Sequence, residues 1–259
     1  MPEQWIALII VGLVAGVASG MFGIGGGVII VPVLTVLLGF QLKMAVGTSL
    51  AALLMPVSIF AVIAYYRAGK LKIGTAAWVA AGLVFGALLG AQIALNMEPK
   101  PLQQLYGIFL FYMAWRFTEP RKWLAERRGE KPAPAPEGLT EVKGWVLLVV
   151  GFGAGILSGM FGIGGGVVIV PVLVALLHFD QKQAVGTSLA ALLLPVSIGA
   201  VISYYQQDLL DIAVAACVAA GLVGGAFVGA KIALGLPSAT VKRLYGIFLL
   251  FVALRFLFF

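Results

Sequence analysis

Two short motifs, each present twice in the chain, hold the residue types that could bind a ligand. The first is a glycine cluster at residues 23–27 that recurs at residues 162–166. Each glycine costs roughly 1 kcal/mol relative to alanine inside a helix, so the cluster predicts a helix break. Freed backbone N–H groups, followed by the positive end of a new helix, make an anion site without a full charge. A simple turn between two helices is the alternative. The candidate binding residues are Gly25, Gly26, Gly27, Gly164, Gly165 and Gly166.

The second motif, Ala-Val-Gly-Thr-Ser-Leu, occupies residues 45–50 and recurs at residues 184–189. Its hydroxyl groups either cap a helix at the start of an apolar run or donate hydrogen bonds to a ligand. A proline later in the same run, Pro56 or Pro195, should kink the helix and free a backbone carbonyl. The candidate binding residues of this motif are Thr48, Ser49, Thr187 and Ser188.

Lys231 is a further candidate because it breaks the similarity of the two halves, where the first half has Gln92. It could hold a substrate, or its amine could reach out to the membrane surface. The ionisable side chains in or near the apolar runs are basic, which favours an anionic over a cationic cargo. The tyrosine pairs at residues 65–66 and 204–205 are expected at the membrane interface.

Metal, cofactor and enzyme chemistry find little support in the sequence. The chain has one histidine, His178, and one cysteine, Cys217, so it offers no cysteine or histidine cluster for a metal site. No carboxylate lies inside an apolar run, and no nucleophile is paired with a base. We therefore expect neither an enzyme nor a bound cofactor.

The elements that position these motifs are membrane helices. The chain is 62% hydrophobic and 10% charged, with a mean hydropathy of +1.10. A soluble protein, a nucleic-acid binder or a disordered chain is therefore excluded, despite a net charge of +7. The first half shows apolar segments at about residues 5–20, 24–39, 46–65, 75–95 and 105–118. The first two are expected to form either two crossings or a re-entrant hairpin. Rows of glycines spaced four apart predict close helix packing.

The chain contains an internal repeat at an offset of 139 residues. Residues 19–59 match residues 158–198 at 33 of 41 positions without a gap. Residues 119–143 between the halves hold 11 of the 27 charged residues and read as a solvated connector. We expect a first transmembrane repeat at 1–118, a charged, proline-rich cytoplasmic linker at 119–143, and a second transmembrane repeat at 144–259.

Opposite charges in equivalent loops indicate that the two repeats are inverted. The connection at 67–72 carries three basic residues, whereas its copy at 206–211 carries two acids and no base. Because cytoplasmic loops are enriched in Lys and Arg, these loops are expected on opposite sides of the membrane. The predicted fold is an all-α polytopic membrane protein with two inverted repeats, each opening with a glycine-broken or re-entrant helix.

The doubled motifs resemble the TauE/SafE sulfite exporter family, also called the 4-toluene sulfonate uptake permeases. The resemblance rests on Gly-x-Gly-Gly-Gly followed five residues later by Pro32 or Pro171, and then on Ala-Val-Gly-Thr-Ser-Leu. It implies transport of small sulfur-containing anions, such as sulfite or organosulfonates, across the inner cell membrane. A secondary carrier with alternating access is the leading hypothesis. An anion channel, or a permease for a different organic anion, is the alternative. The oligomeric state, including a homodimer, stays open.

Overall fold

The computed structural model describes residues 2–36, 38–118, 142–175 and 177–235, together with residues 250, 251, 253, 254 and 256. All regular structure in these residues is α-helical. The helices of the first half are α1 (Pro2–Phe22), α2 (Gly27–Val36), α3 (Leu42–Leu54), α4 (Ile59–Arg67), α5 (Ile73–Asn96) and α6 (Pro99–Thr118). Those of the second half are α8 (Gly144–Phe161), α9 (Gly166–Ala175), α10 (Gln181–Leu193), α11 (Ile198–Tyr205) and α12 (Ile212–Gly235). The linker proposed at 119–143 falls almost wholly outside the described residues.

The chain forms two compact units whose boundaries differ from those of the sequence halves. Unit 1 comprises residues 1–97 and 138–235, and unit 2 comprises residues 98–137 and 236–259. Unit 1 therefore contains the glycine clusters and the hydroxyl motifs of both halves. In unit 2, the ring of Tyr106 on α6 meets the ring of Phe256 edge-to-face, with 5.2 Å between ring centroids.

Four helices of unit 1 are long and apolar enough to cross a membrane. They are α1, α5, α8 and α12, and two bent helix pairs raise the number of candidate spans in the described residues to six. Large apolar side chains such as Phe85 and Ile212 are exposed on these helices, as a lipid-facing surface requires. The chain is a multi-pass membrane protein.

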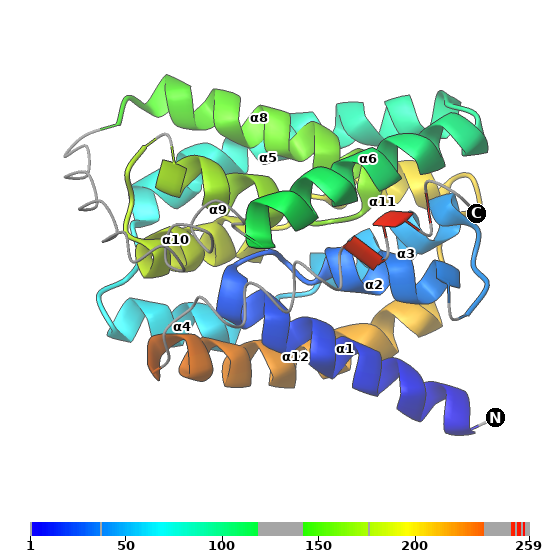
Figure 1. Ribbon diagram of the computed structural model, residues 1–259, viewed down its shortest axis with the longest axis horizontal. Helices are drawn as coiled ribbons and strands as arrows, with labels where there is room; N and C mark the ends of the chain where they lie inside the picture. Colours follow the sequence, from blue (N-terminus) through cyan, green and yellow to red (C-terminus); the bar gives the residue numbers. More distant parts are fainter. Residues whose placement is uncertain are drawn as a thin grey trace, which may run out of the picture. The chain divides into compact units, whose positions relative to one another are not determined.

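The long helices pack as two parallel pairs through their glycine rows. A Cβ on Gly12 or Gly20 of α1 would collide with backbone oxygens of α12, and Gly86 of α5 has the same relation to α8. Small residues let the helix backbones approach closely, which is how helices associate without a hydrophobic driving force. The packing predicted from the glycine spacing is thus observed, and each pair joins the two halves. In Figure 1, α1 and α12 run one way and α5 and α8 run the other.

The third apolar segment of each half consists of two helices rather than one kinked helix. In the first half, α3 and α4 meet at a bend of 51°, and α10 and α11 repeat this bend in the second. Met55, which precedes Pro56, is extended at ψ 150°, as is Leu194 before Pro195. Proline disfavours a helical conformation in the preceding residue and cannot donate a backbone hydrogen bond. The predicted kink is therefore a complete break.

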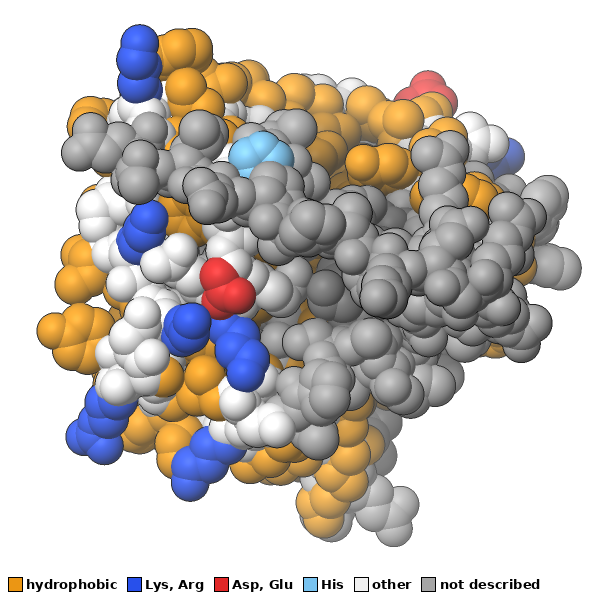
Figure 2. Space-filling model, turned by 60° about the vertical axis from the view of Figure 1, so that its left-hand side comes forward, with side chains coloured by type: hydrophobic (Ala, Val, Ile, Leu, Met, Phe, Trp, Pro, Cys, Tyr) orange, Lys and Arg blue, Asp and Glu red, His pale blue; other side chains and the backbone are white. Residues whose placement is uncertain are grey.

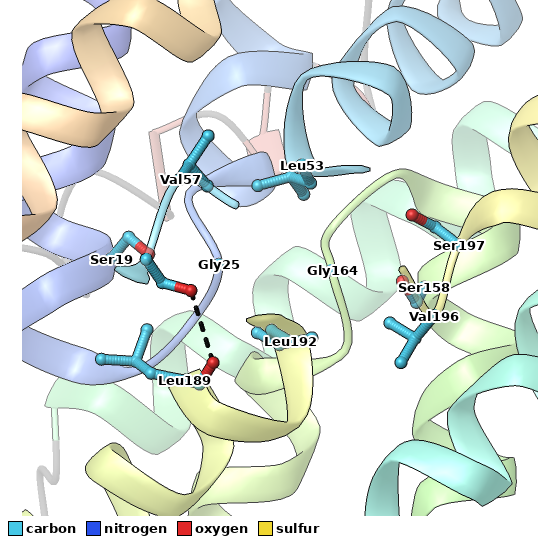
Figure 3. A pocket seen from close by; sticks show the side chains of 11 residues that line it. Ser19, Gly25, Leu53, Val57, Ser158, Gly164, Leu189, Leu192, Val196 and Ser197 are labelled. Atoms are coloured by element: carbon cyan, nitrogen blue, oxygen red, sulfur yellow. Dashed lines mark hydrogen bonds between the residues drawn. The ribbon is translucent and has the colours of Figure 1, made fainter. Parts of the chain in front are cut away.

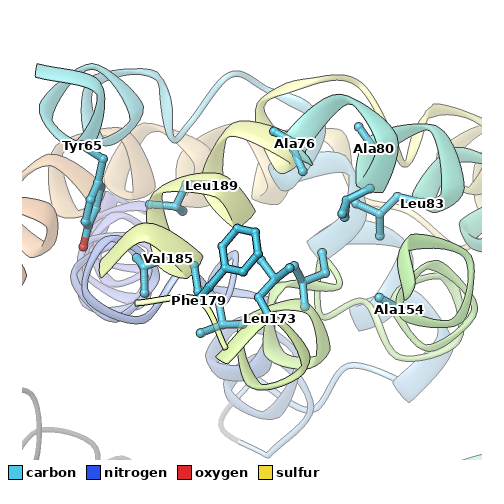
Figure 4. Packing of buried hydrophobic residues seen from close by; sticks show 14 of the residues in the cluster. Tyr65, Ala76, Ala80, Leu83, Ala154, Leu173, Phe179, Val185 and Leu189 are labelled. Atoms are coloured by element: carbon cyan, nitrogen blue, oxygen red, sulfur yellow. The ribbon is translucent and has the colours of Figure 1, made fainter. Parts of the chain in front are cut away.

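Buried apolar side chains from both halves fill the space between these helices. Figure 4 shows Leu83, Leu173 and Phe179 among the residues of this core. Helix α4 packs on α12, α11 packs on α5, and α3 packs on both α11 and α12. Because most of these contacts join one half to the other, unit 1 has a shared interior.

The connections before α5 and α12 lie at opposite ends of unit 1 (Figure 1). At one end, Lys70 forms an exposed ion pair with Asp180, with 3.5 Å between Nζ and Oδ2. Figure 2 shows Lys and Arg side chains gathered around an acidic side chain at this end. The sequence places Arg67, Lys70 and Lys72 in the connection here, whereas the connection at the other end holds Asp208 and Asp211.

Candidate functional site

The two glycine clusters meet in the interior of unit 1. A Cβ on Gly27 would collide with the carbonyl oxygen of Gly162, and a Cβ on Gly166 would collide with that of Gly23. Each cluster therefore crosses the other at backbone contact, and only glycine fits at the crossing. Each cluster does form a short turn between two helices, and the two turns pack directly against each other.

Each break needs glycine for its backbone conformation as well. Gly25 and Gly26 have φ angles of 80° and 86°, in the left-handed region that side chains other than glycine rarely adopt. This conformation ends α1 and starts α2 within a few residues. It leaves α2 with 10 residues, too short to cross a membrane alone.

The hydroxyls of the second motif hold the glycine breaks in place. Ser49 Oγ donates to Gly162 O, and Ser188 Oγ donates to Gly23 O, each at 2.8 Å. Both serines are fully buried. Each bond ties one half's hydroxyl motif to the other half's glycine cluster, so these serines support the breaks from behind.

The adjacent threonines bind loop backbone instead. Thr48 Oγ1 accepts a hydrogen bond from the backbone N–H of Asp211 at 3.0 Å, and Thr187 Oγ1 accepts one from Lys72 at 3.2 Å. The helix-capping alternative is wrong, because α3 begins at Leu42 and α10 at Gln181. The residues before the motif are good helix formers, so the helix extends upstream of the hydroxyls.

A small cavity lies where the two breaks meet. Its volume is about 20 Å³, which exceeds the roughly 10–15 Å³ that one water molecule needs. Of the predicted site residues, only Gly25 and Gly164 line it. The other lining residues are Ser19, Leu53, Val57, Ser58, Ser158, Leu189, Leu192, Val196 and Ser197.

Four serines give this cavity its polar character. Ser58 Oγ donates to Leu189 O at 3.3 Å. The hydroxyls of Ser19, Ser158 and Ser197 have no hydrogen-bond partner among the described residues, although these side chains are 2%, 3% and 5% exposed. Figure 3 shows Ser19 and Ser197 on opposite sides of the cavity, with the backbone at Gly25 and Gly164 between them.

Sequence reasoning missed these serines because a serine in a membrane helix commonly bonds to its own helix backbone. One signal could have found them. Ser19 and Ser158 occupy equivalent positions in the two halves, as do Ser58 and Ser197. A polar residue kept at both copies of an apolar run is more informative than one that occurs once.

The cavity touches the two short helices at their positive ends. Gly25 and Gly164 each lie two residues before the first residue of α2 or α9. A helix N-terminus carries about half a positive elementary charge and unpaired N–H groups. The arrangement can therefore stabilise an anion with hydroxyls and helix ends.

Lys231 lies away from this cavity. Its side chain is exposed on α12, with Nζ 4.4 Å from the centroid of the Phe227 ring. The equivalent Gln92 donates to Ser203 Oγ at 3.1 Å. The difference between the halves at this position thus lies on the outer surface.

Two tyrosines differ from the expectation that they lie at the membrane interface. Tyr65 and Tyr204 are fully buried, and their hydroxyls donate to Gly20 O and Gly159 O at 3.0 and 3.1 Å. Their neighbours Tyr66 and Tyr205 are exposed as expected. The buried rings pack against Gly186 and Gly47, where glycine leaves room for them. Among the described residues, no group of histidine, cysteine, aspartate and glutamate could hold a metal ion.

Comparison with known proteins shows which family the chain resembles. The family model described as sulfite exporter TauE/SafE matches residues 8–256. A probable membrane transporter protein of Methanocaldococcus jannaschii is 35% identical over 214 residues, which cover 78% of this chain and 72% of that protein. The probable membrane transporter protein YdhB of Bacillus subtilis is 26% identical, with 91% and 93% covered. No solved structure matches the chain.

Proposed function

The chain belongs to the TauE/SafE sulfite exporter family, a family of transporters and not of enzymes, and on this premise we propose that it is a secondary carrier of small sulfur-containing anions. Sulfite and organosulfonates are the substrates we infer. The observation that carries the proposal is the buried cavity between the two glycine breaks. Its serine hydroxyls and its two helix N-termini suit an anion, and no residue lining it is charged.

In this proposal, the anion contacts the cavity serines and the backbone at Gly25 and Gly164. Gly26, Gly27, Gly165 and Gly166 shape the breaks. Ser49 and Ser188 hold the breaks in position. Thr48 and Thr187 hold the connections before α12 and α5. Lys231 acts at the membrane surface, which its exposed position supports.

Alternating access is supported by the size of the cavity and by the direction of the helices. A sulfite ion is larger than the single water molecule for which the cavity has room, so the breaks must separate during transport. Inverted repeats allow the cavity to open toward either face of the membrane. The conformation that one repeat adopts in the inward-open state is adopted by the other repeat in the outward-open state. The opposite directions of the two helix pairs in Figure 1 support inverted repeats.

The charges at the two ends support a cytoplasmic location of the linker, in the inner membrane. Arg67, Lys70 and Lys72 lie at one end of unit 1, and Lys143, at the start of α8, follows the linker. Ring atoms of Trp78, near the start of α5, lie close to Gly144, which places these two helix starts together. Basic residues mark the cytoplasmic side.

Reconstituted vesicles test the proposal. Purified protein in liposomes should take up labelled sulfite with saturation, and an excess of unlabelled sulfite on the other side should accelerate exchange. Ser19→Ala with Ser158→Ala should reduce the flux about tenfold or more, since each lost hydrogen bond to an anion is worth about 1.5–3 kcal/mol. Gly224→Ala, which adds a Cβ to open space on α12, is the control.

The alternatives predict different results in the same vesicles. An anion channel would give large single-channel currents without exchange acceleration. A permease for another organic anion would leave sulfite flux at the background level while a carboxylate was transported. Sulfite flux equal to that of protein-free liposomes would reject the proposal.

A further inference from the structure

The cavity between the glycine breaks is lined without any ionisable side chain. Its described lining consists of glycine, serine, leucine and valine residues. The polar groups that can bind an anion there are therefore serine hydroxyls and the backbone N–H groups that precede α2 and α9.

Ionisable groups on the surrounding helices are directed elsewhere. Lys43 and Lys182 donate to the carbonyl oxygens of Leu95 and Leu234, each at 2.9 Å. The hydroxyls of Tyr65 and Tyr204 donate to helix carbonyls. The remaining described ionisable side chains of unit 1 lie in connections, at helix ends or on outer faces: Tyr66, Arg67, Lys70, Lys72, Lys143, His178, Asp180, Tyr205, Asp208, Asp211, Cys217 and Lys231. None of them lines the cavity.

The unpartnered hydroxyls supply the second observation that points to a ligand. Ser19 and Ser158 are at least 97% buried, since their exposed fractions are 2% and 3%. Both serines line the cavity, so their hydroxyls are free to bind an oxygen-rich ligand between them. A hydroxyl also accepts hydrogen bonds, so it can receive the proton of an acidic O–H group on the ligand.

We propose that the site accepts its substrate only as a singly charged anion. Hydroxyls and backbone groups can bind one negative charge, whereas a second would be buried with no cationic side chain in the described lining to compensate for it. A diprotic acid such as sulfite is therefore carried as hydrogen sulfite, together with its proton, and releases that proton to water on the far side. An organosulfonate carries a single charge at any neutral pH, and its organic group can lie against Leu53 and Leu192.

This inference rests on the proposed function. Two probe anions, sulfite and methanesulfonate, distinguish failure of the inference from failure of the proposed function. Sulfite loses its second proton near neutral pH, whereas methanesulfonate stays singly charged from mildly acidic to mildly alkaline pH. Uptake of both by proteoliposomes is measured over that range with the same pH on both sides. At fixed total sulfite, below saturation, sulfite uptake should fall about tenfold for each pH unit above the second ionisation. Methanesulfonate uptake should stay constant.

Each outcome has a distinct meaning. Sulfite uptake that stays flat or rises with pH means that the dianion is carried, which overturns the inference and leaves the proposed function intact. A fall in the uptake of both anions means that a group of the protein titrates, which also overturns it. Background uptake of both anions rejects the proposed function, and the inference with it.

A variant adds a check on the protein side. Ser19→Ala with Ser158→Ala should lower the uptake of both anions by the same factor without moving the pH profile of sulfite. A profile that shifts in this variant would show that the hydroxyls control protonation, against the inference. The charge that crosses the membrane with each anion is an independent measurement. An applied membrane potential should affect uptake as expected for one net negative charge per hydrogen sulfite or methanesulfonate.

Discussion

At the crossing of the two glycine breaks, the packing leaves no room for even one additional carbon atom. Gly27 and Gly166 lie against carbonyl oxygens of the opposite break, with no space for a methyl group. The same oxygens accept hydrogen bonds from Ser49 and Ser188. Steric exclusion and hydrogen bonding therefore act on the same backbone atoms.

We expect Gly27→Ala to destabilise the protein strongly. The added Cβ would push the break away from Gly162, and overpacking of this kind costs about 1–3 kcal/mol or more. Thermal unfolding in detergent, followed by size-exclusion chromatography, measures the loss. Gly153→Ala on α8 is the matched control, because its Cβ meets nothing within 4 Å. Equal stability of the two variants would contradict the crossing.

The ion pair between Lys70 and Asp180 should contribute little to stability. Both side chains are exposed, and exposed pairs are worth about 0–1 kcal/mol. Lys70→Ala should therefore change the unfolding temperature by no more than about 4 °C, and added salt should remove the difference. A large loss of stability in thermal unfolding would show that the pair does more than the geometry indicates.

At the scale of helices, the proline breaks place polar groups at the cavity. Val57 and Ser58 line it because α3 stops at Leu54 and α4 starts at Ile59. A continuous helix would keep Ser58 within a helical ladder and turn its backbone away from the opposite half. The 51° bend thus helps to form the cavity.

Pro56→Ala should reduce transport more than it reduces stability. Alanine permits the helix to continue across the break, because it supplies the missing N–H and removes the restriction on Met55. We expect a several-fold loss of anion flux in proteoliposomes with a higher helical content by circular dichroism. Pro101→Ala is the control. This proline lies in the first turn of α6, where a backbone N–H would have no intrahelical acceptor, so its missing N–H removes no helix hydrogen bond. Unchanged flux in Pro56→Ala would separate the break from transport.

At the scale of the molecule, the two ends of unit 1 carry different charges on a common framework. The connection at 67–72 is basic and its equivalent at 206–211 is acidic. Both connections bind the hydroxyl motif of the other half through a backbone N–H, from Lys72 or from Asp211. The same backbone contact thus occurs at both ends of unit 1, and the two connections differ in the charge of their side chains.

Labelling of single cysteines tests that orientation. In a Cys217→Ala background, Ala68→Cys and Gln207→Cys replace exposed residues at equivalent positions of the two connections. An impermeant maleimide added to intact cells should label the cysteine at 207, and the cysteine at 68 only after the cells are opened. Labelling of both from the same side would reject inverted repeats.

Much of this architecture could be predicted from the sequence, because it depends on local patterns. The apolar segment at 75–95 became α5 (Ile73–Asn96), and the glycine cluster and Pro56 break helices where they occur. The partners of the hydroxyls could not be predicted. Ser188 and Gly23 are 165 residues apart, and which backbone atoms face each other depends on how the two halves pack. The cavity serines were missed for the same reason.

The mutual crossing of the breaks has a consequence for biosynthesis. When the first half has left the ribosome, the carbonyl oxygen of Gly23 has no hydroxyl from Ser188 to bind, and the surface of α1 has no α12 to cover it. We therefore expect the first half to remain incompletely packed in the membrane until the second half is inserted. Expressed alone, it should be degraded, whereas the two halves produced as separate polypeptides should rescue each other.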